Sequence, residues 1–162
     1  MMTAPAQNDG RRCPASPGPV KADETLALGL YSPELIDKVT RKITKEALRS
    51  DYLSKQVHHD ECGRSSGLSV ARVESAIGVE ELKKTIVEIA SKPIGADKKR
   101  EAFGHATIKV LWLQKRALSV LDDGMDSFTS HAIVRSEFTR SQIKRVRDEM
   151  IEELNKTLVT WS

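Results

Sequence analysis

A serine nucleophile elbow has the spacing G-x-S-x-G, which this chain matches from Gly63 to Gly67 around Ser65, with His58 and His59 shortly before it. Such an elbow works because a strand-to-helix turn holds the serine out of a parallel sheet, where a histidine can take its proton. No β-strand pattern precedes the match, and the chain is short for that fold. The sequence therefore predicts a flexible glycine and serine loop and no hydrolase at Ser65.

Residues 58–62 (HHDEC) concentrate side chains that can bind metal ions. Adjacent residues of a loop cannot all point at one ion. The chain has no second cluster, such as C-x-x-C or H-x-x-x-H, that would complete a tetrahedral site. We therefore expect a solvated polar loop here, and neither a metal ion nor another cofactor.

Basic side chains are concentrated in two places, which makes them the positions most suited to contacting a partner. In the second group, Arg145 and Glu149 stand four residues apart, as do Lys144 and Asp148, so much of this charge is predicted to pair along one helix. The same pattern also suits a surface that sets the register of a partner helix or binds an anionic partner. The two groups are Lys98, Lys99 and Arg100, and Arg135, Arg140, Lys144, Arg145 and Arg147.

Residues 69–91 have the rhythm of a helix-turn-helix, because Gly78 separates two short apolar-striped segments. A helix that reads DNA presents donors or cations at its start, whereas this one begins with Glu80 and Glu81. Glu74 also stands where the motif usually has a small residue. A plain helical hairpin in the core is the preferred interpretation.

The balance of charge excludes the large positive field of a dedicated nucleic-acid binder. The 162 residues carry 26 basic and 23 acidic side chains, a net charge of +3, and aromatic residues make up only 4%. No apolar run approaches the ~18 residues of a membrane span, so no membrane association is expected. Any electrostatic partner must therefore be recognised locally.

The two cysteines indicate a reducing compartment. Cys13 falls in a proline-rich segment and Cys62 in a polar loop, so a structural disulfide between them is not expected. The first twenty residues contain prolines and Asp9 where a secretory peptide needs a continuous apolar core. We expect an intracellular, cytoplasmic protein.

The chain divides into a tail and one domain. Residues 1–24 hold four of the six prolines and few apolar side chains, which predicts a disordered tail. Residues 25–162 are predicted to form a helical domain. A short apolar segment from Leu26 to Tyr31 is interpreted as a strap that packs onto it.

Apolar residues recur at spacings of three and four through most of this domain, which is typical of amphipathic helices. No segment shows sustained alternation of apolar and polar residues, so a sheet is not expected. The sequence therefore predicts an all-α fold, a four- to five-helix bundle. Helices are expected at residues 32–57, 69–77, 80–91, 96–123 and 130–160.

The function that these observations favour is a non-enzymatic interaction or assembly module, whose apolar helix faces bind another protein or a second copy of the chain. The alternative is a nucleic-acid-associated protein that uses the basic surfaces or the 69–91 segment. An enzyme ranks third, because a site assembled from unrelated positions would leave no motif.

Overall fold

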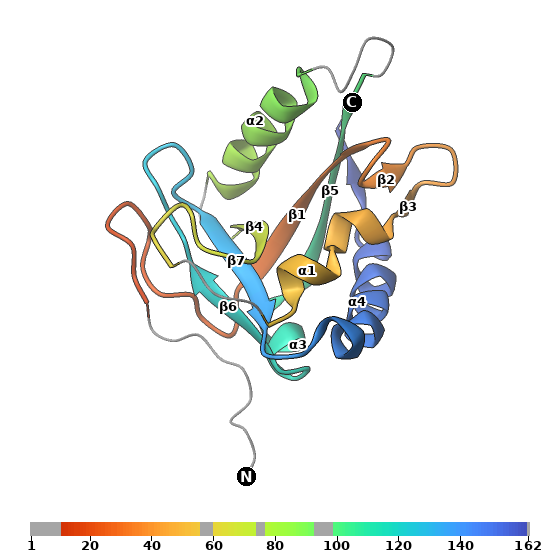
Figure 1. Cartoon of the computed structure of the whole chain (residues 1–162). Coiled ribbons are helices and arrows are strands. Elements are labelled where there is room, and N and C mark those ends of the chain that lie inside the picture. Colours follow the sequence, from red (N-terminus) through yellow and green to blue (C-terminus); the bar gives the residue numbers. More distant parts are fainter. Residues whose placement is uncertain (1–10, 56–59, 74–76, 93–98, 162) are drawn as a thin grey trace.

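The prediction of an all-α bundle is wrong. The computed structural model describes residues 11–55, 60–73, 77–92 and 99–161, and it combines a six-stranded sheet with helices on both of its faces (Figure 1). The strand order is β6-β7-β4-β1-β5-β8, and every neighbouring pair is antiparallel. The strands are β1 (Thr25–Ser32), β4 (Leu68–Arg72), β5 (Glu101–Lys109), β6 (Leu118–Asp122), β7 (His131–Ser136) and β8 (Val159–Thr160).

Helices and short elements cover the two faces of this sheet. Helix α2 (Gly78–Ala90) lies on one face, and α1 (Ser50–Leu53) and α4 (Arg140–Asn155) lie on the other (Figure 1). A hairpin of β2 (Ile36–Asp37) and β3 (Lys42–Ile43) leads through the 3-10 helix η1 (Lys45–Leu48) into α1. Helix α3 (Val110–Gln114) joins β5 to β6. Among the described residues, no helix has the length and apolar character needed to cross a bilayer.

Strand β1 shows why the sheet was not predicted from the spacing of apolar residues. Leu26, Leu28 and Leu30 are buried in the core shared with α1 and α4, while Ala27 and Gly29 are buried beneath α2. Because both faces are covered, the strand has no polar face and shows no alternation of apolar and polar residues. The segment interpreted as a strap is therefore a central strand of the sheet.

Two of the predicted helices are confirmed in part. Helix α2 occupies nearly the predicted range 80–91, and α4 occupies the middle of the predicted range 130–160. Helix α4 begins at Thr139, whose hydroxyl accepts the N–H of Gln142 at 3.2 Å while Gln142 Oε1 accepts the N–H of Thr139 at 2.9 Å. This capping box ends the extended segment that precedes the helix.

The other predicted helices are corrected. Residues 32–57 contain β2, β3, η1 and α1; residues 69–72 lie in β4; and residues 96–123 contain β5, α3 and β6. The preferred interpretation of 69–91 as a helical hairpin is therefore wrong, and the helix-turn-helix interpretation falls with it, because residues 69–72 belong to a strand. Short apolar segments of strand, turn and strand produced the spacing that was interpreted as one long helix.

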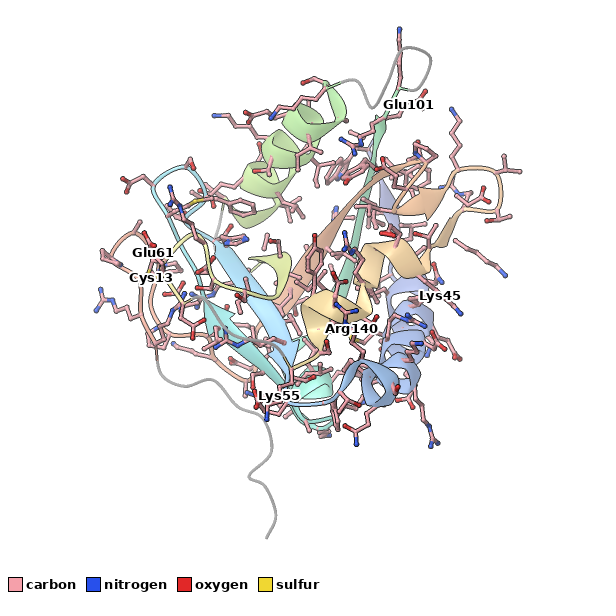
Figure 2. The ribbon with its side chains drawn as sticks, in the orientation of Figure 1. Cys13, Lys45, Lys55, Glu61, Glu101 and Arg140 are labelled. Carbon is pink, nitrogen blue, oxygen red and sulfur yellow. A yellow bond between two sulfur atoms is a disulfide. The ribbon has the colours of Figure 1, made fainter. Side chains whose placement is uncertain are left out.

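The N-terminal segment is ordered over residues 11–24. Cys13 and Val20 are buried, and Cys13 forms a disulfide with Cys62. Figure 2 shows Cys13 beside the loop that carries Glu61. These contacts were not expected from a disordered tail of residues 1–24, and residues 1–10 lie outside the described residues. The expectation of two unpaired cysteines is wrong, since covalent pairing does not require either residue to belong to a regular element.

Candidate functional site

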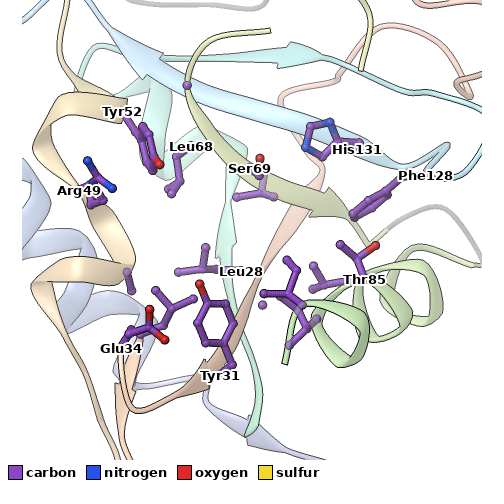
Figure 3. Close-up of a pocket in the computed structure, with 18 of the residues that line it drawn as sticks. Leu28, Tyr31, Glu34, Arg49, Tyr52, Leu68, Ser69, Thr85, Phe128 and His131 are labelled. Carbon is purple, nitrogen blue, oxygen red and sulfur yellow. The ribbon is translucent and has the colours of Figure 1, made fainter. Parts of the chain in front are cut away.

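A groove of about 1140 Å³ opens over the middle of the sheet. The facing edges of β1 and β4 form its floor, α2 lines it on one face of the sheet, and η1 and α1 line it on the other face (Figure 3). The floor and lower walls are apolar, whereas Tyr31, Glu34 and Arg100 lie at one end and His131 lies at the other. This volume slightly exceeds the ~300–1,000 Å³ usual for small-molecule sites.

The groove exists because β1 and β4 separate. Their ladder pairs Leu26 with Arg72 and Ala27 with Ala71, and no further pairs between these two described strands follow. Beyond Ala27, β1 continues for five residues alongside β5, and β4 continues toward Leu68 alongside β7. Beyond the Ala27–Ala71 pair, β1 and β4 are therefore no longer hydrogen-bonded to each other, and the split between them forms the groove floor.

The register shows which main-chain groups face this split. Thr25 O accepts the N–H of Val73 on the β4 side, and Glu24 O accepts the N–H of Val110 on the β5 side. Successive residues of a strand direct their main-chain groups to opposite edges. In this register Leu28 would lie opposite Val70, and the next hydrogen-bonded pair would join Gly29 to Ser69. Both Gly29 and Ser69 line the groove. The groove floor therefore presents N–H and C=O groups from two facing strand edges.

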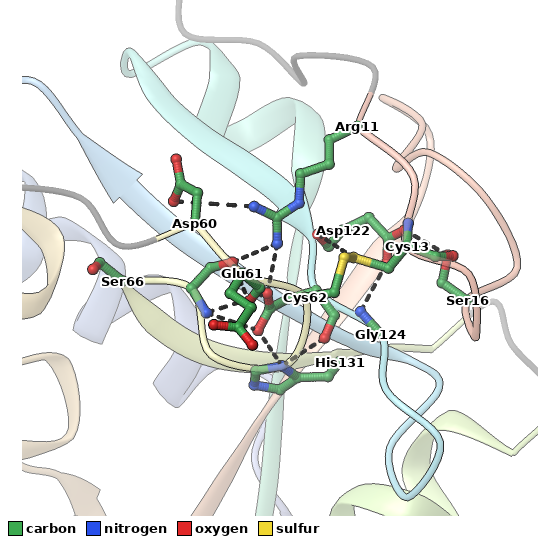
Figure 4. A network of polar contacts seen from close by, with 12 residues as sticks. Arg11, Cys13, Ser16, Asp60, Glu61, Cys62, Ser66, Asp122, Gly124 and His131 are labelled. Carbon is green, nitrogen blue, oxygen red and sulfur yellow. Dashed lines mark hydrogen bonds and ion pairs between the residues drawn. A yellow bond between two sulfur atoms is a disulfide. The ribbon is translucent and has the colours of Figure 1, made fainter.

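His131 marks one end of the groove and is held from behind by Asp123. Its Nδ1 lies 2.9 Å from Asp123 Oδ2 and 3.2 Å from the main-chain oxygen of Asp123 (Figure 4). Both partners are oxygens that accept, so Nδ1 carries a proton, and in the neutral imidazole Nε2 is then the acceptor. His131 is nearly buried and is one of the residues that line the groove.

Asp123 is fully buried and is satisfied from several directions. Arg11 Nη2 donates to its Oδ1 at 2.6 Å, and the Ser65 hydroxyl donates to the same oxygen. Burial by itself raises the pKa of a carboxyl, but the hydrogen bonds from His131 and Ser65 outweigh it and hold the pKa of Asp123 below its ordinary value. The carboxylate is therefore ionised at neutral pH and keeps the imidazole of His131 in one orientation.

The opposite end of the groove is polar and aromatic. Arg100 forms a two-point ion pair with Glu34, at 2.6 Å and 2.8 Å, and its guanidinium lies 5.1 Å from the centre of the Tyr31 ring. Hydrogen bonding to Glu34 raises the pKa of Arg100, and burial followed by the Glu34 charge raises the pKa of Tyr31. This end therefore holds an ordered pair of opposite charges.

The two sequence motifs of the 58–67 loop prove to be structural. Ser65 bonds to Asp123 and not to His131, so the G-x-S-x-G match forms no nucleophile elbow. Asp60 pairs with Arg135, with Nη2 to Oδ2 at 3.0 Å, and Cys62 is used in the disulfide. His58 and His59 lie outside the described residues. Among those that are described, no group of His, Cys, Asp and Glu side chains is arranged to hold a metal ion.

The predicted partner-binding cations are dispersed in the structure. Arg135 and Arg147 are buried, and Arg147 pairs with its neighbour Asp148. Arg100 lies at the groove rim, Lys99 is exposed, and Lys98 lies outside the described residues. The remaining three cations, Arg140, Lys144 and Arg145, lie on α4. Figure 2 shows Arg140 near α1.

Sequence reasoning missed the residues that define this site. Gly29 and Ser69 belong to no sequence motif. They matter because the β1–β4 ladder ends before it reaches them. Asp123 directly follows β6 and His131 begins β7, and their separation of eight residues signals nothing unless the strands are known. The available signal was the 58–67 loop, which the sequence analysis interpreted as a flexible, solvated loop, because its contact with Asp123 depends on the tertiary fold.

Acidification is expected to destabilise the protein through Asp123 and Glu81. Burial opposes ionisation of Glu81, but hydrogen bonds from Ser130 and Thr129 outweigh it and lower its pKa. A lowered folded-state pKa contributes stability above the unfolded value near ~4, and this stability is lost as the pH falls through the folded value. Melting temperatures measured between pH 7 and pH 3 should fall steeply below about pH 4, and less steeply in Glu81→Gln.

Glu80→Gln, an exposed neighbour on the same helix, is the matched control and should keep the wild-type profile. Equal profiles for Glu81→Gln and the wild type would show that Glu81 is not stabilised as described.

No family model, no curated protein and no solved structure matches this chain. The description of the groove, its two free strand edges and the Asp123–His131 pair therefore rests on the geometry of the structure alone.

Proposed function

We propose that this protein binds an extended segment of a partner protein, which enters the groove as an added strand between β1 and β4. The observation that carries the proposal is the early end of the β1–β4 ladder, which leaves Gly29 and Ser69 facing each other across the groove floor. Strand addition obtains affinity from main-chain hydrogen bonds and specificity from pockets for alternate side chains.

The surroundings of the split suit such a segment. Alternate side chains of an added strand would point to the α2 face, near Leu82 and Ile86, and to the opposite face, near Leu28 and Leu68. Both faces are apolar, so a segment of apolar residues would be buried on both sides. Burial of each such side chain contributes about 1.5–3 kcal/mol before the ordering entropy is subtracted.

Amide hydrogen exchange tests the free edges directly. The amides of Gly29 and Ser69 should exchange faster than those of Leu28 and Val70, which point toward β5 and β7. A peptide selected from a displayed library of random 12-residue sequences should slow exchange at Gly29 and Ser69 on binding. Exchange followed by NMR reports both results at single residues.

A matched pair of variants separates the groove from the rest of α2. Thr85 lines the groove, so Thr85→Trp should fill it and weaken the selected peptide at least tenfold. Val87 is exposed on the same helix and does not line the groove, so Val87→Trp should bind normally. A peptide that binds both variants equally and leaves Gly29 and Ser69 unprotected would contradict the proposal.

The choice of partner class rests on the same geometry. A second copy of the chain as partner would slow exchange at Gly29 and Ser69 as protein concentration rises, without any peptide. The nucleic-acid alternative draws less support, because Arg135 and Arg147 are buried and Arg100 is paired with Glu34. Polyanion binding at low salt remains its test.

The Cys13–Cys62 disulfide supports a location in an oxidising compartment, in contrast to the reducing interior expected from the sequence. Binding by strand addition requires no reaction, and the prediction that the chain is not an enzyme stays a prediction.

A further inference from the structure

Ser69 and His131 both line the groove near the end where Asp123 holds the imidazole. Cross-strand pairing joins Ala71 to His131 and Ser69 to Ile133, so Ser69 and His131 lie on the same face of neighbouring strands, two residues out of register. Such diagonal neighbours have Cβ atoms about 7 Å apart, within reach of an imidazole. Figure 3 shows Ser69 on β4 and His131 on the neighbouring strand β7, both beside the groove.

The roles follow from what each group can donate or accept. Asp123 fixes the proton on His131 Nδ1, which leaves Nε2 as the acceptor in the neutral imidazole. Ser69 is exposed in the groove and supplies a hydroxyl. The main-chain N–H groups of Gly29 and Ser69, which face the split, are donors for an oxygen that becomes negatively charged.

We propose that Ser69 and His131 are catalytic residues, positioned by Asp123, that hydrolyse carboxylic esters with apolar acyl groups. The apolar class follows from the α2 face of the groove, where Leu82, Ile86 and Phe128 lie on the same face of the sheet as Ser69. The site goes beyond the binding role proposed above. It is also unrelated to Ser65, the serine on which the prediction of no hydrolase was based.

The reaction needs only the ester and water. Ser69 Oγ attacks the carbonyl carbon, its proton passes to His131 Nε2, and the carbonyl oxygen takes the electron pair. When the carbonyl re-forms, the bond to the alcohol oxygen breaks and the alcohol leaves with the proton from Nε2. Water then attacks the acyl-serine with Nε2 as base, which releases the acid and restores the Ser69 hydroxyl.

The test uses a biotinylated fluorophosphonate, which labels activated serines, on the oxidised full-length protein. Label should be found on Ser69 by mass spectrometry of its peptides and should be absent in Ser69→Ala, an exposed change that leaves the fold intact. Ser119→Ala, a half-exposed serine on β6, should label normally. Hydrolysis of p-nitrophenyl butyrate should fall at least a hundredfold in Ser69→Ala and in His131→Gln.

Nitrogen NMR of His131 tests the positioning role of Asp123 separately from stability. The wild type should show the proton on Nδ1, and Asp123→Asn, if folded, should lose this tautomer together with labelling. Label that is absent from the folded wild type, that lies on Ser65, or that persists in Ser69→Ala would overturn the proposal. None of these results would affect peptide protection at Gly29, so the binding role is tested independently.

Discussion

Replacing Arg72 with methionine is expected to lower the free energy of unfolding by about 3–5 kcal/mol, because it leaves two carboxylates buried without their cation. Arg72 donates to Glu24 from Nε at 2.8 Å and from Nη2 at 2.7 Å, and Nη1 lies 3.7 Å from Asp122. All three side chains are almost fully buried. Chemical denaturation at pH 7, followed by circular dichroism, measures the change.

Two further variants identify the cause. Arg72→Met combined with Glu24→Gln should recover part of the loss, because one uncompensated charge is removed with its partner. Lys38→Met breaks an exposed pair with Glu101 at 3.1 Å and should leave the denaturation midpoint nearly unchanged. Equal, small effects at Arg72 and Lys38 would show that the buried pair contributes no more than an exposed one.

Arg72 also explains why strand β4 could not be predicted. In the sequence, residues 69–77 were predicted to form a helix, with Val70 and Val73 on its apolar stripe. In the structure Arg72 can be buried because it donates hydrogen bonds to Glu24 and to the main-chain oxygens of Gly18 and Pro19. A buried arginine depends on partners that lie about fifty residues away, which local periodicity cannot reveal.

The elements that were predicted correctly carry their own local signals. Helix α4 has a capping box at Thr139 and buries Ile143, Met150 and Leu154 on one face, as the spacing predicted. Helix α2 has acidic residues in its first turn and an apolar face toward the sheet. The strands carry no comparable local signal, because their stability depends on neighbours distant in the sequence.

The groove was beyond prediction for the same reason. It requires the register of β1 against β4, the point at which that ladder ends, and the placement of α2 over Gly29. A Cβ at Gly29 would overlap the side chain of Ile86, so this glycine allows the close approach of the helix. The sequence contains the residue, but only the fold shows what it faces.

Removing the disulfide through Cys13→Ser combined with Cys62→Ser is expected to lower the free energy of unfolding by about 2–5 kcal/mol. The two cysteines are 49 residues apart, so the bond closes a long loop and restricts the unfolded chain. The main-chain N–H of Cys13 donates to Asp122 at 2.7 Å, and a serine at this position can keep that bond. The double variant therefore isolates the covalent link, and denaturation under oxidising conditions measures its contribution.

A reductant supplies the control for this prediction, because it should lower the denaturation midpoint of the wild type and leave that of the double variant unchanged. Loss of the disulfide should also affect the groove, because the bond joins residues 11–24 to the loop whose Ser65 donates a hydrogen bond to Asp123. Arg11, two residues before Cys13, donates to the same carboxylate. Reduction should therefore loosen the setting of His131 and broaden its NMR signal, whereas a wild type with an unchanged midpoint and an unchanged His131 signal would show that noncovalent contacts alone hold this segment in place.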